Sequence, residues 1–179
     1  MPKHPYPKEL EELCTLPDGR VVCLRPIRPD DEPEHYDLLA KTSATDRRFR
    51  FFASVNTISK QAMDRFTHID YDREMAFIAC TETGRGRHET LGVIRTIADD
   101  SGHEAEFAII IRSDIKNQGL GHALMGKAIR YCGERGILRL MGQVMADNKR
   151  MLDFARKEGF QATMNLEEKV YDITLDLRL

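Results

Sequence analysis

The stretch from Ile111 to Arg130, IRSDIKNQGLGHALMGKAIR, most constrains how this chain can fold. An apolar run from Phe107 to Ile111 precedes it, and a polar turn with two glycines leads into a helix-like pattern. Glycines let a backbone approach a phosphate closely, and the first N–H groups of a helix have no partner inside the helix. We therefore expect a strand, a turn that binds a pyrophosphate, and a helix.

The pair of glycines, Gly119 and Gly121, is weak evidence by itself. The turn lacks the G-K-[ST] of a P-loop, and no convincing acidic residue of a Rossmann site follows it. The alternative is a tight strand-to-helix turn with a structural role only. A cation at Lys116 and a second strand-to-helix turn at Asp147-Asn148 favour binding.

Composition limits the class of protein. The chain has 179 residues, 41% of them hydrophobic, so we expect one domain over residues 1–179. Its 27 basic and 29 acidic residues give a net charge of −2, which argues against nucleic-acid and membrane partners. No apolar run reaches the roughly 18 residues of a membrane helix, and the N-terminus does not resemble a signal peptide. The four cysteines are widely spaced, which favours reduced thiols, a cytoplasmic location and no metal site.

The hydrophobic pattern predicts a chain of strands and helices in the order β-α-α-β-β-β-α-β-α-β-β. Residues 1–17 are rich in proline and charge and are expected to form an arm on the domain. Strands are expected at 21–25, 75–81, 91–97, 104–111, 138–145 and 170–177, with a short one after Phe160, and helices at 33–41, 59–69, after the glycine turn and after Asp147 or Asn148. The three strands between 75 and 111, joined by short turns, should form an antiparallel meander.

The segment RRFRFF, residues 47–52, interleaves phenylalanines with arginines. One interpretation is a helix or turn that buries Phe49, Phe51 and Phe52 while the arginines pair with carboxylates. The other is a cation–π or substrate-facing patch. We favour burial, because no basic excess supports a nucleic-acid role.

The order of elements, the loop KNQGLGHAL and the segment NKRMLDFARKEGF resemble the GNAT N-acetyltransferase superfamily. A closer resemblance is to the acetyltransferase domain of bacterial Pat-type protein-lysine acetyltransferases. It is carried by YPKELE, LPDGRVVCLRPIRPDDEPEH, DRRFRFF, EAEFAIIIRSDIKNQGLG and ARKEGF. The resemblance implies an α/β (α+β) GNAT fold. This is a mixed, mostly antiparallel sheet of six or seven strands with about four helices and a cofactor in a splay between two central strands.

The resemblance also implies how acetyl-CoA is held. In the superfamily, the backbone amides of a Q/R-x-x-G-x-G/A loop bind its pyrophosphate, and Lys116 stands at the Q/R position. Strand-end backbone groups meet the pantetheine and the thioester carbonyl, and Asn148 begins the segment beside the pantetheine arm, although it can equally be only an N-cap. The implied acetyl-CoA contacts are Ile110, Ile111, Lys116, Asn117, Gln118, Gly119, Leu120, Gly121, His122, Ala123 and Asn148.

Glu106 is the candidate catalytic residue. Strand alternation in EAEFAIII places it on one face with Ala108 and Ile110. Neutralising a lysine amine of pKa near 10.4 at pH 7 costs about 4–5 kcal/mol. A carboxylate acting directly or through a water can accept that proton. The resemblance supports a glutamate base on this strand; the alternative is a structural glutamate in an ion pair or facing solvent.

Other candidates for the chemistry are weaker. Many superfamily members place a tyrosine acid seven residues after the asparagine, but Ala155 occupies that position, so the thiolate is expected to leave unassisted or to take a proton from water. His103 and His122 flank the candidate residues, yet a lone histidine is more often a surface or packing residue. A covalent intermediate on Cys80 or Cys132 lacks an adjacent base.

These inferences predict an N-acetyltransferase that uses acetyl-CoA and no metal, and that acts on a protein lysine by direct transfer. The resemblance suggests an AMP-forming acyl-CoA synthetase as the protein partner. A monomer or a homodimer is expected. Two alternatives stay open: an N-acetyltransferase for a small amine (a polyamine, amino acid or antibiotic), and a non-catalytic acyl-CoA-sensing domain.

Overall fold

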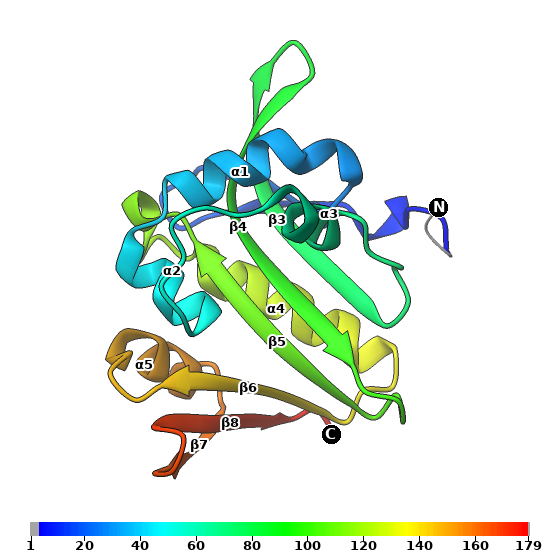
Figure 1. The fold of residues 1–179 in the computed structure, drawn as a ribbon. Coiled ribbons are helices and arrows are strands. Elements are labelled where there is room, and N and C mark those ends of the chain that lie inside the picture. The colour runs from blue at the N-terminus through cyan, green and yellow to red at the C-terminus, as the bar shows by residue number, and fades with distance from the viewer. Residues whose placement is uncertain (1–3, 179) are drawn as a thin grey trace.

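The computed structural model describes residues 4–178, and an eight-stranded sheet in the order β1-β2-β3-β4-β5-β6-β8-β7 lies at its centre (Figure 1). The strands are β1 (Glu12–Thr15), β2 (Val21–Pro26), β3 (Glu74–Gly84), β4 (Arg87–Ala98), β5 (Glu104–Ile111), β6 (Arg139–Met145), β7 (Gln161–Asn165) and β8 (Val170–Asp176). Every neighbouring pair is antiparallel except β5 and β6, which are parallel. The sheet is therefore mixed and mostly antiparallel, as expected.

Five α-helices accompany the sheet in the described part of the chain. They are α1 (Glu32–Ala40), α2 (Ala44–Phe51), α3 (Lys60–Thr67), α4 (Leu120–Glu134) and α5 (Lys149–Lys157), with short 3-10 turns at Lys8–Leu10, Pro29–Asp31 and Ser113–Ile115. Figure 1 shows α1, α2 and α3 on one face of the sheet and α4 on the other, with α5 beside β6. The two faces are thus covered by different parts of the chain.

Two elements differ from the expected count of six or seven strands and about four helices. Residues 12–15 form an edge strand that pairs with β2, with Glu12 opposite Leu24 and Thr15 opposite Val21, so this part of the chain is not merely an arm. Short, charged segments are typical of sheet edges, and partner pairing rather than side-chain pattern decides whether they are strands. The additional helix is α2, which contains most of RRFRFF and begins where the Ser43 hydroxyl accepts the Asp46 N–H at 3.1 Å.

Local signals placed most of the other elements correctly. Strands β3, β4 and β5 form the expected meander, although β3 and β4 extend further, to a two-residue turn in which Arg85 and Gly86 both have positive φ. Ser59 caps α3 through the Ala62 N–H at 3.1 Å, and Gly159 follows α5 with a φ of 99°. Each of these features depends on residues close in sequence.

Part of the core lies between the sheet and α4. Phe77 is 1% exposed and meets the ring of Tyr131 edge-on, with the centroids 5.4 Å apart. Leu120, Leu124 and Ala128 form the inner face of α4 and are buried. Leu138 was expected as an apolar strand residue, but β6 begins only at Arg139 and Leu138 is 40% exposed.

No helix within residues 4–178 has both the length and the apolar character required to cross a bilayer.

Candidate active site

Strands β5 and β6 separate soon after they pair. Their parallel pairing covers only Glu104–Glu106 against Arg139–Met141, whereas β5 continues beside β4 to Ile111. Beyond Glu106, the edge of β5 that is turned toward β6 has no strand partner in residues 4–178. Figure 1 shows the two strands diverging toward α2 and α5. This fork is the expected splay between two central strands.

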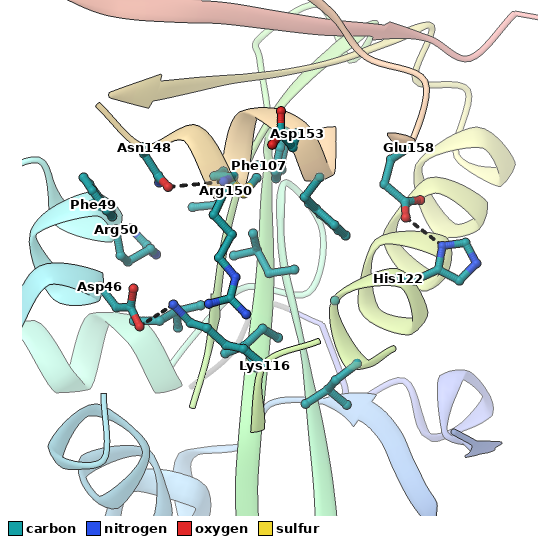
Figure 2. A pocket seen from close by; sticks show the side chains of 18 of the residues that line it. Asp46, Phe49, Arg50, Phe107, Lys116, His122, Asn148, Arg150, Asp153 and Glu158 are labelled. Atoms are coloured by element: carbon teal, nitrogen blue, oxygen red, sulfur yellow. Dashed lines mark hydrogen bonds and ion pairs between the residues drawn. The ribbon is translucent and has the colours of Figure 1, made fainter. Parts of the chain in front are cut away.

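A cavity of about 940 Å³ occupies the fork. Its walls come from β5, the glycine turn, the start of α4, α5 and α2 (Figure 2). Nine of the eleven residues expected to contact acetyl-CoA line it: Ile110, Ile111, Lys116, Asn117, Gly119, Leu120, Gly121, His122 and Asn148. Gln118 and Ala123 do not; Ala123 packs against the core. The fold therefore gathers most of these positions around one space, and contact with acetyl-CoA stays a prediction.

The turn before α4 has an unusual backbone. Asn117 and Gly119 have φ values of 65° and 84°, in the left-handed region that favours glycine. A Cβ on Gly119 would lie 2.8 Å from Cδ of Pro17, so both conformation and space require glycine there. No side chain caps α4, which leaves its first amides available to an anion in the cavity.

The cation of this turn is already paired. Lys116 forms an ion pair with Asp46 of α2, and the Ser113 hydroxyl donates to the same carboxylate at 2.7 Å. Burial opposes ionisation of Asp46, but these hydrogen bonds outweigh it and lower the pKa of the carboxyl. Lys116 therefore fixes α2 to the turn, and its charge is balanced within the protein.

A second source of positive charge was not predicted. Figure 2 shows Arg150 extending from α5 toward Lys116, and Lys157 of the same helix also lines the cavity. Arg150, Asp153, Phe154 and Lys157 are spaced by three, four and seven residues, so they share one face of α5. That spacing was a signal in the sequence, although only the structure shows which face is turned to the cavity.

Glu106 is exposed and lines the cavity at the point where β5 and β6 part. The expected alternation is correct, because Ala105 and Phe107 are buried on the opposite face of the strand. None of the hydrogen bonds and ion pairs among residues 4–178 involves its carboxylate. A structural ion pair is therefore not found in this part of the chain, whereas the exposure of the side chain also agrees with the other alternative, a glutamate that faces solvent.

Asn148 has a structural partner as well as a place in the cavity. Its Oδ1 accepts the Met151 N–H at 3.2 Å and caps α5 (Figure 2). The amide nitrogen of the same side chain makes no hydrogen bond to residues 4–178. The N-cap role is thus observed, and the nitrogen is left to contact a ligand.

The RRFRFF segment only partly follows the favoured interpretation: Phe51 packs against the core and Arg48 pairs with Asp147, but the segment also faces the cavity. Phe49, Arg50, Phe51 and Phe52 all line it, and Phe52 is 43% exposed. Burial of Phe52 was wrong because α2 ends there, with a φ of 57° that turns the chain away. Two guanidinium groups lie over neighbouring rings, Arg48 at 4.8 Å from the Phe49 centroid and Arg50 at 4.9 Å from that of Phe51.

The remaining candidates take no obvious part. His122 lines the cavity but its Nδ1 lies 2.7 Å from Oε1 of Glu158, while His103 is outside the lining (Figure 2). Cys80 and Cys132 are buried away from the cavity, and burial raises the pKa of each thiol to about 11, which disfavours a thiolate nucleophile. Ala155 is fully buried.

Comparison with known proteins agrees with this geometry. The family model described as "Acetyltransferase (GNAT) domain" matches residues 22–161. An acetyltransferase of Pseudomonas aeruginosa is 30% identical over 146 residues, which cover 82% of this chain and 78% of that protein.

Two solved structures extend the comparison. The GNAT domain of S. lividans PAT has a TM-score of 0.87 and 26% identity, over 96% of this chain and 99% of that one. Spermidine N-acetyltransferase from Vibrio cholerae, solved with CoA and spermine, has a TM-score of 0.70 and 17% identity, over 87% of this chain and 95% of that one. The second likeness is one of fold alone. From the family match, the fold and the fork with its glycine turn, we conclude that this chain belongs to the GNAT acetyltransferase family.

Proposed function

We propose that this protein transfers the acetyl group of acetyl-CoA directly to a lysine amine of another protein, with Glu106 as the general base. The observation that carries the proposal is the carboxylate of Glu106, which lines the cavity at the fork between β5 and β6 and has no ion-pair partner among the described residues. A carboxylate held without a cation is free to accept a proton from a bound amine.

Several features of the cavity suit acetyl-CoA. The uncapped start of α4 and the glycine turn suit the pyrophosphate, and Arg150 and Lys157 add positive charge nearby. The unpaired edge of β5 near Ile110 and Ile111 offers backbone groups to the pantetheine and the thioester carbonyl. These are the residues that we propose hold the co-substrate, together with the side-chain nitrogen of Asn148.

The chemistry then needs one proton acceptor and one electrophile. The lysine nitrogen attacks the thioester carbonyl carbon, a C–N bond forms, and the C–S bond breaks to release the CoA thiolate. Glu106 takes the proton of the attacking amine, directly or through a water. Direct transfer is favoured over a covalent enzyme intermediate because the buried thiols of Cys80 and Cys132 lie outside the cavity.

A protein lysine is proposed as the acceptor because the structural likeness to the GNAT domain of S. lividans PAT extends over nearly the whole chain. The test is release of CoA thiol from acetyl-CoA with two acceptor sets, an AMP-forming acyl-CoA synthetase and a panel of small amines that includes spermidine. We expect turnover with the synthetase, located at one lysine by mass spectrometry. Turnover with small amines alone would contradict the protein acceptor, and thiol release with neither set would contradict transfer itself.

Asn148 allows the cap and the co-substrate contact to be separated. We expect Asn148→Ala to lose about 1 kcal/mol of folding stability, because the N-cap acceptor is removed. Asn148→Asp keeps an oxygen for the Met151 N–H and should keep that stability, but it lacks the amide nitrogen. Both variants should bind acetyl-CoA several-fold more weakly in calorimetry. Unchanged affinity in Asn148→Asp would limit this residue to its cap.

A further inference from the structure

Arg50 carries a charge that nothing in the described chain balances. Its side chain lies between the large cavity and a small adjoining one, and Figure 2 shows it extending from α2 toward the large cavity. None of the hydrogen bonds and ion pairs among residues 4–178 involves its guanidinium. The neighbouring arginines differ, because Arg47 donates to three backbone carbonyls and Arg48 pairs with Asp147 at 2.6 Å.

The surroundings make this lack of a partner costly. Arg95, on the wall of the small cavity, already pairs with Glu74 at 2.6 Å and donates to the Phe66 carbonyl. His35 on the same wall is 3% exposed, and burial lowers its pKa to about 4, so it is uncharged at neutral pH. Burial and the charge of Arg95 lower the pKa of Arg50 to about 10, which still leaves the guanidinium charged. Arg50 is partly buried, and a partly buried cation beside a second guanidinium is destabilised when no carboxylate pairs with it.

The carboxylates of the cavity do not relieve this cost. Asp46 is engaged by Lys116 and Ser113, and Glu158 lies against His122. Within residues 4–178, neither Glu106 nor Asp153 forms an ion pair with Arg50. Charges kept under such conditions mark sites where a ligand supplies the opposite charge. A planar guanidinium is suited to a carboxylate, which it can bind through two parallel hydrogen bonds.

The position of Arg50 identifies which ligand could bring that carboxylate. The small cavity is lined by Ala108 and Ile110 as well as Arg50, and both residues share the face of β5 that carries Glu106. At about 3.3 Å per residue, they lie roughly 7 and 13 Å along the strand from Glu106. Arg50 is therefore on the side of the sheet where the proposed base acts.

We propose that Arg50 binds a carboxylate of the acceptor, so that the preferred acceptor amine has a carboxylate roughly 7 to 13 Å away. This inference rests on the proposed function, because it assigns the second half of the same acceptor site. An acidic side chain two residues from a lysine in an extended peptide has this separation, and so does the α-carboxylate of free lysine. The shared chemistry is an amine and a carboxylate on one molecule.

The test compares matched acceptors that differ only in that charge. The first pair is two lysine peptides, one with Glu and one with Gln two residues after the lysine. The second pair is free lysine, which has the carboxylate, and lysinamide, which lacks it. For the wild-type protein we expect kcat/KM to be about 10- to 100-fold higher for the charged member of at least one pair, the range expected for a charged hydrogen bond. Arg50→Gln should bring that ratio close to one, and Arg50→Lys should restore part of it. Arg48→Gln, in the same helix but already paired, should keep the wild-type ratio.

Each outcome either supports or overturns the proposed carboxylate site at Arg50. A peptide ratio that depends on Arg50 identifies an acidic protein segment, and a ratio confined to free lysine identifies an amino acid; both support the inference. It is overturned if the wild-type protein uses both members of each pair equally, or if the ratio survives in Arg50→Gln. It is also overturned if Arg50→Gln changes the preference between succinyl-CoA and acetyl-CoA but leaves the preference between charged and uncharged acceptors unchanged.

A binding measurement distinguishes failure of the carboxylate site at Arg50 from failure of the proposed lysine acetyltransferase function. The Nε–H resonance of Arg50, assigned by its loss in Arg50→Gln, should shift on titration with N-acetylglutamate and not with N-acetylglutamine. If no amine is acetylated but this shift is seen, the lysine acetyltransferase proposal fails and the carboxylate site stands. If lysines are acetylated without any charge dependence and no shift occurs, the carboxylate site fails and the proposed function stands.

Discussion

Glu106→Gln is expected to lower turnover by about 10²- to 10⁴-fold at pH 7, the usual contribution of a general base. The substitution keeps the size of the side chain and removes only its ability to accept the proton. Because Glu106 is exposed and makes no hydrogen bond or ion pair within residues 4–178, stability should change by less than about 0.5 kcal/mol. Affinity for acetyl-CoA, measured by calorimetry, should be unchanged.

The pH dependence distinguishes a base from a structural residue. A lysine amine with a pKa near 10.4 is almost fully protonated at pH 7, so proton removal is most needed there. As the pH approaches about 10, a growing fraction of the amine is already neutral, and the deficit of Glu106→Gln should shrink. Glu104→Gln is the matched control, because Glu104 lies in the same strand but pairs with Arg139 at 3.1 Å. A rate near wild type at pH 7, or a deficit that stays constant to pH 10, would reject Glu106 as the base.

Gly119→Ala should weaken acetyl-CoA binding by at least about tenfold, and it should also destabilise the fold. A φ of 84° costs a residue with a Cβ about 1–2 kcal/mol. The new Cβ would also lie 2.8 Å from Cδ of Pro17, whose ring cannot rotate away. The turn must then move. The amides of the turn and of the start of α4 would therefore lose the orientation that they have in the wild-type protein. Each kcal/mol of lost stability lowers the Tm by about 2–4 °C for a chain of this size.

Helix α4, which follows Gly119, contains a control for adding a methyl group. A Cβ on Gly133 would have no atom within 4 Å, and its φ is not positive. Gly133→Ala should therefore bind acetyl-CoA normally and match or exceed the wild-type Tm, since alanine favours a helix by about 0.8–1 kcal/mol. Normal acetyl-CoA affinity in Gly119→Ala would show that the turn does not hold the pyrophosphate.

Much of the fold could be predicted because its signals are local. The caps at Ser59 and Asn148, the left-handed Gly159 and the alternation around Glu106 all depend on residues within a few positions of one another. Where pairing between distant segments decides the outcome, the prediction was wrong or incomplete. Residues 12–15 become a strand only because β2 offers an open edge.

The features of the candidate site also fall into those that local sequence predicts and those that only the tertiary structure shows. The glycine turn, the strand before it and the carboxylate on that strand were determined by the sequence alone, since backbone conformation and strand alternation are set by adjacent residues. Only the tertiary structure decided that Asp46 balances Lys116 and that α5 turns Arg150 toward the cavity. It also decided that Arg50 and Glu106 have no ion-pair partner within residues 4–178. The physical reason is that burial and charge balance depend on which distant segments fold against each residue, and a local pattern does not contain that information.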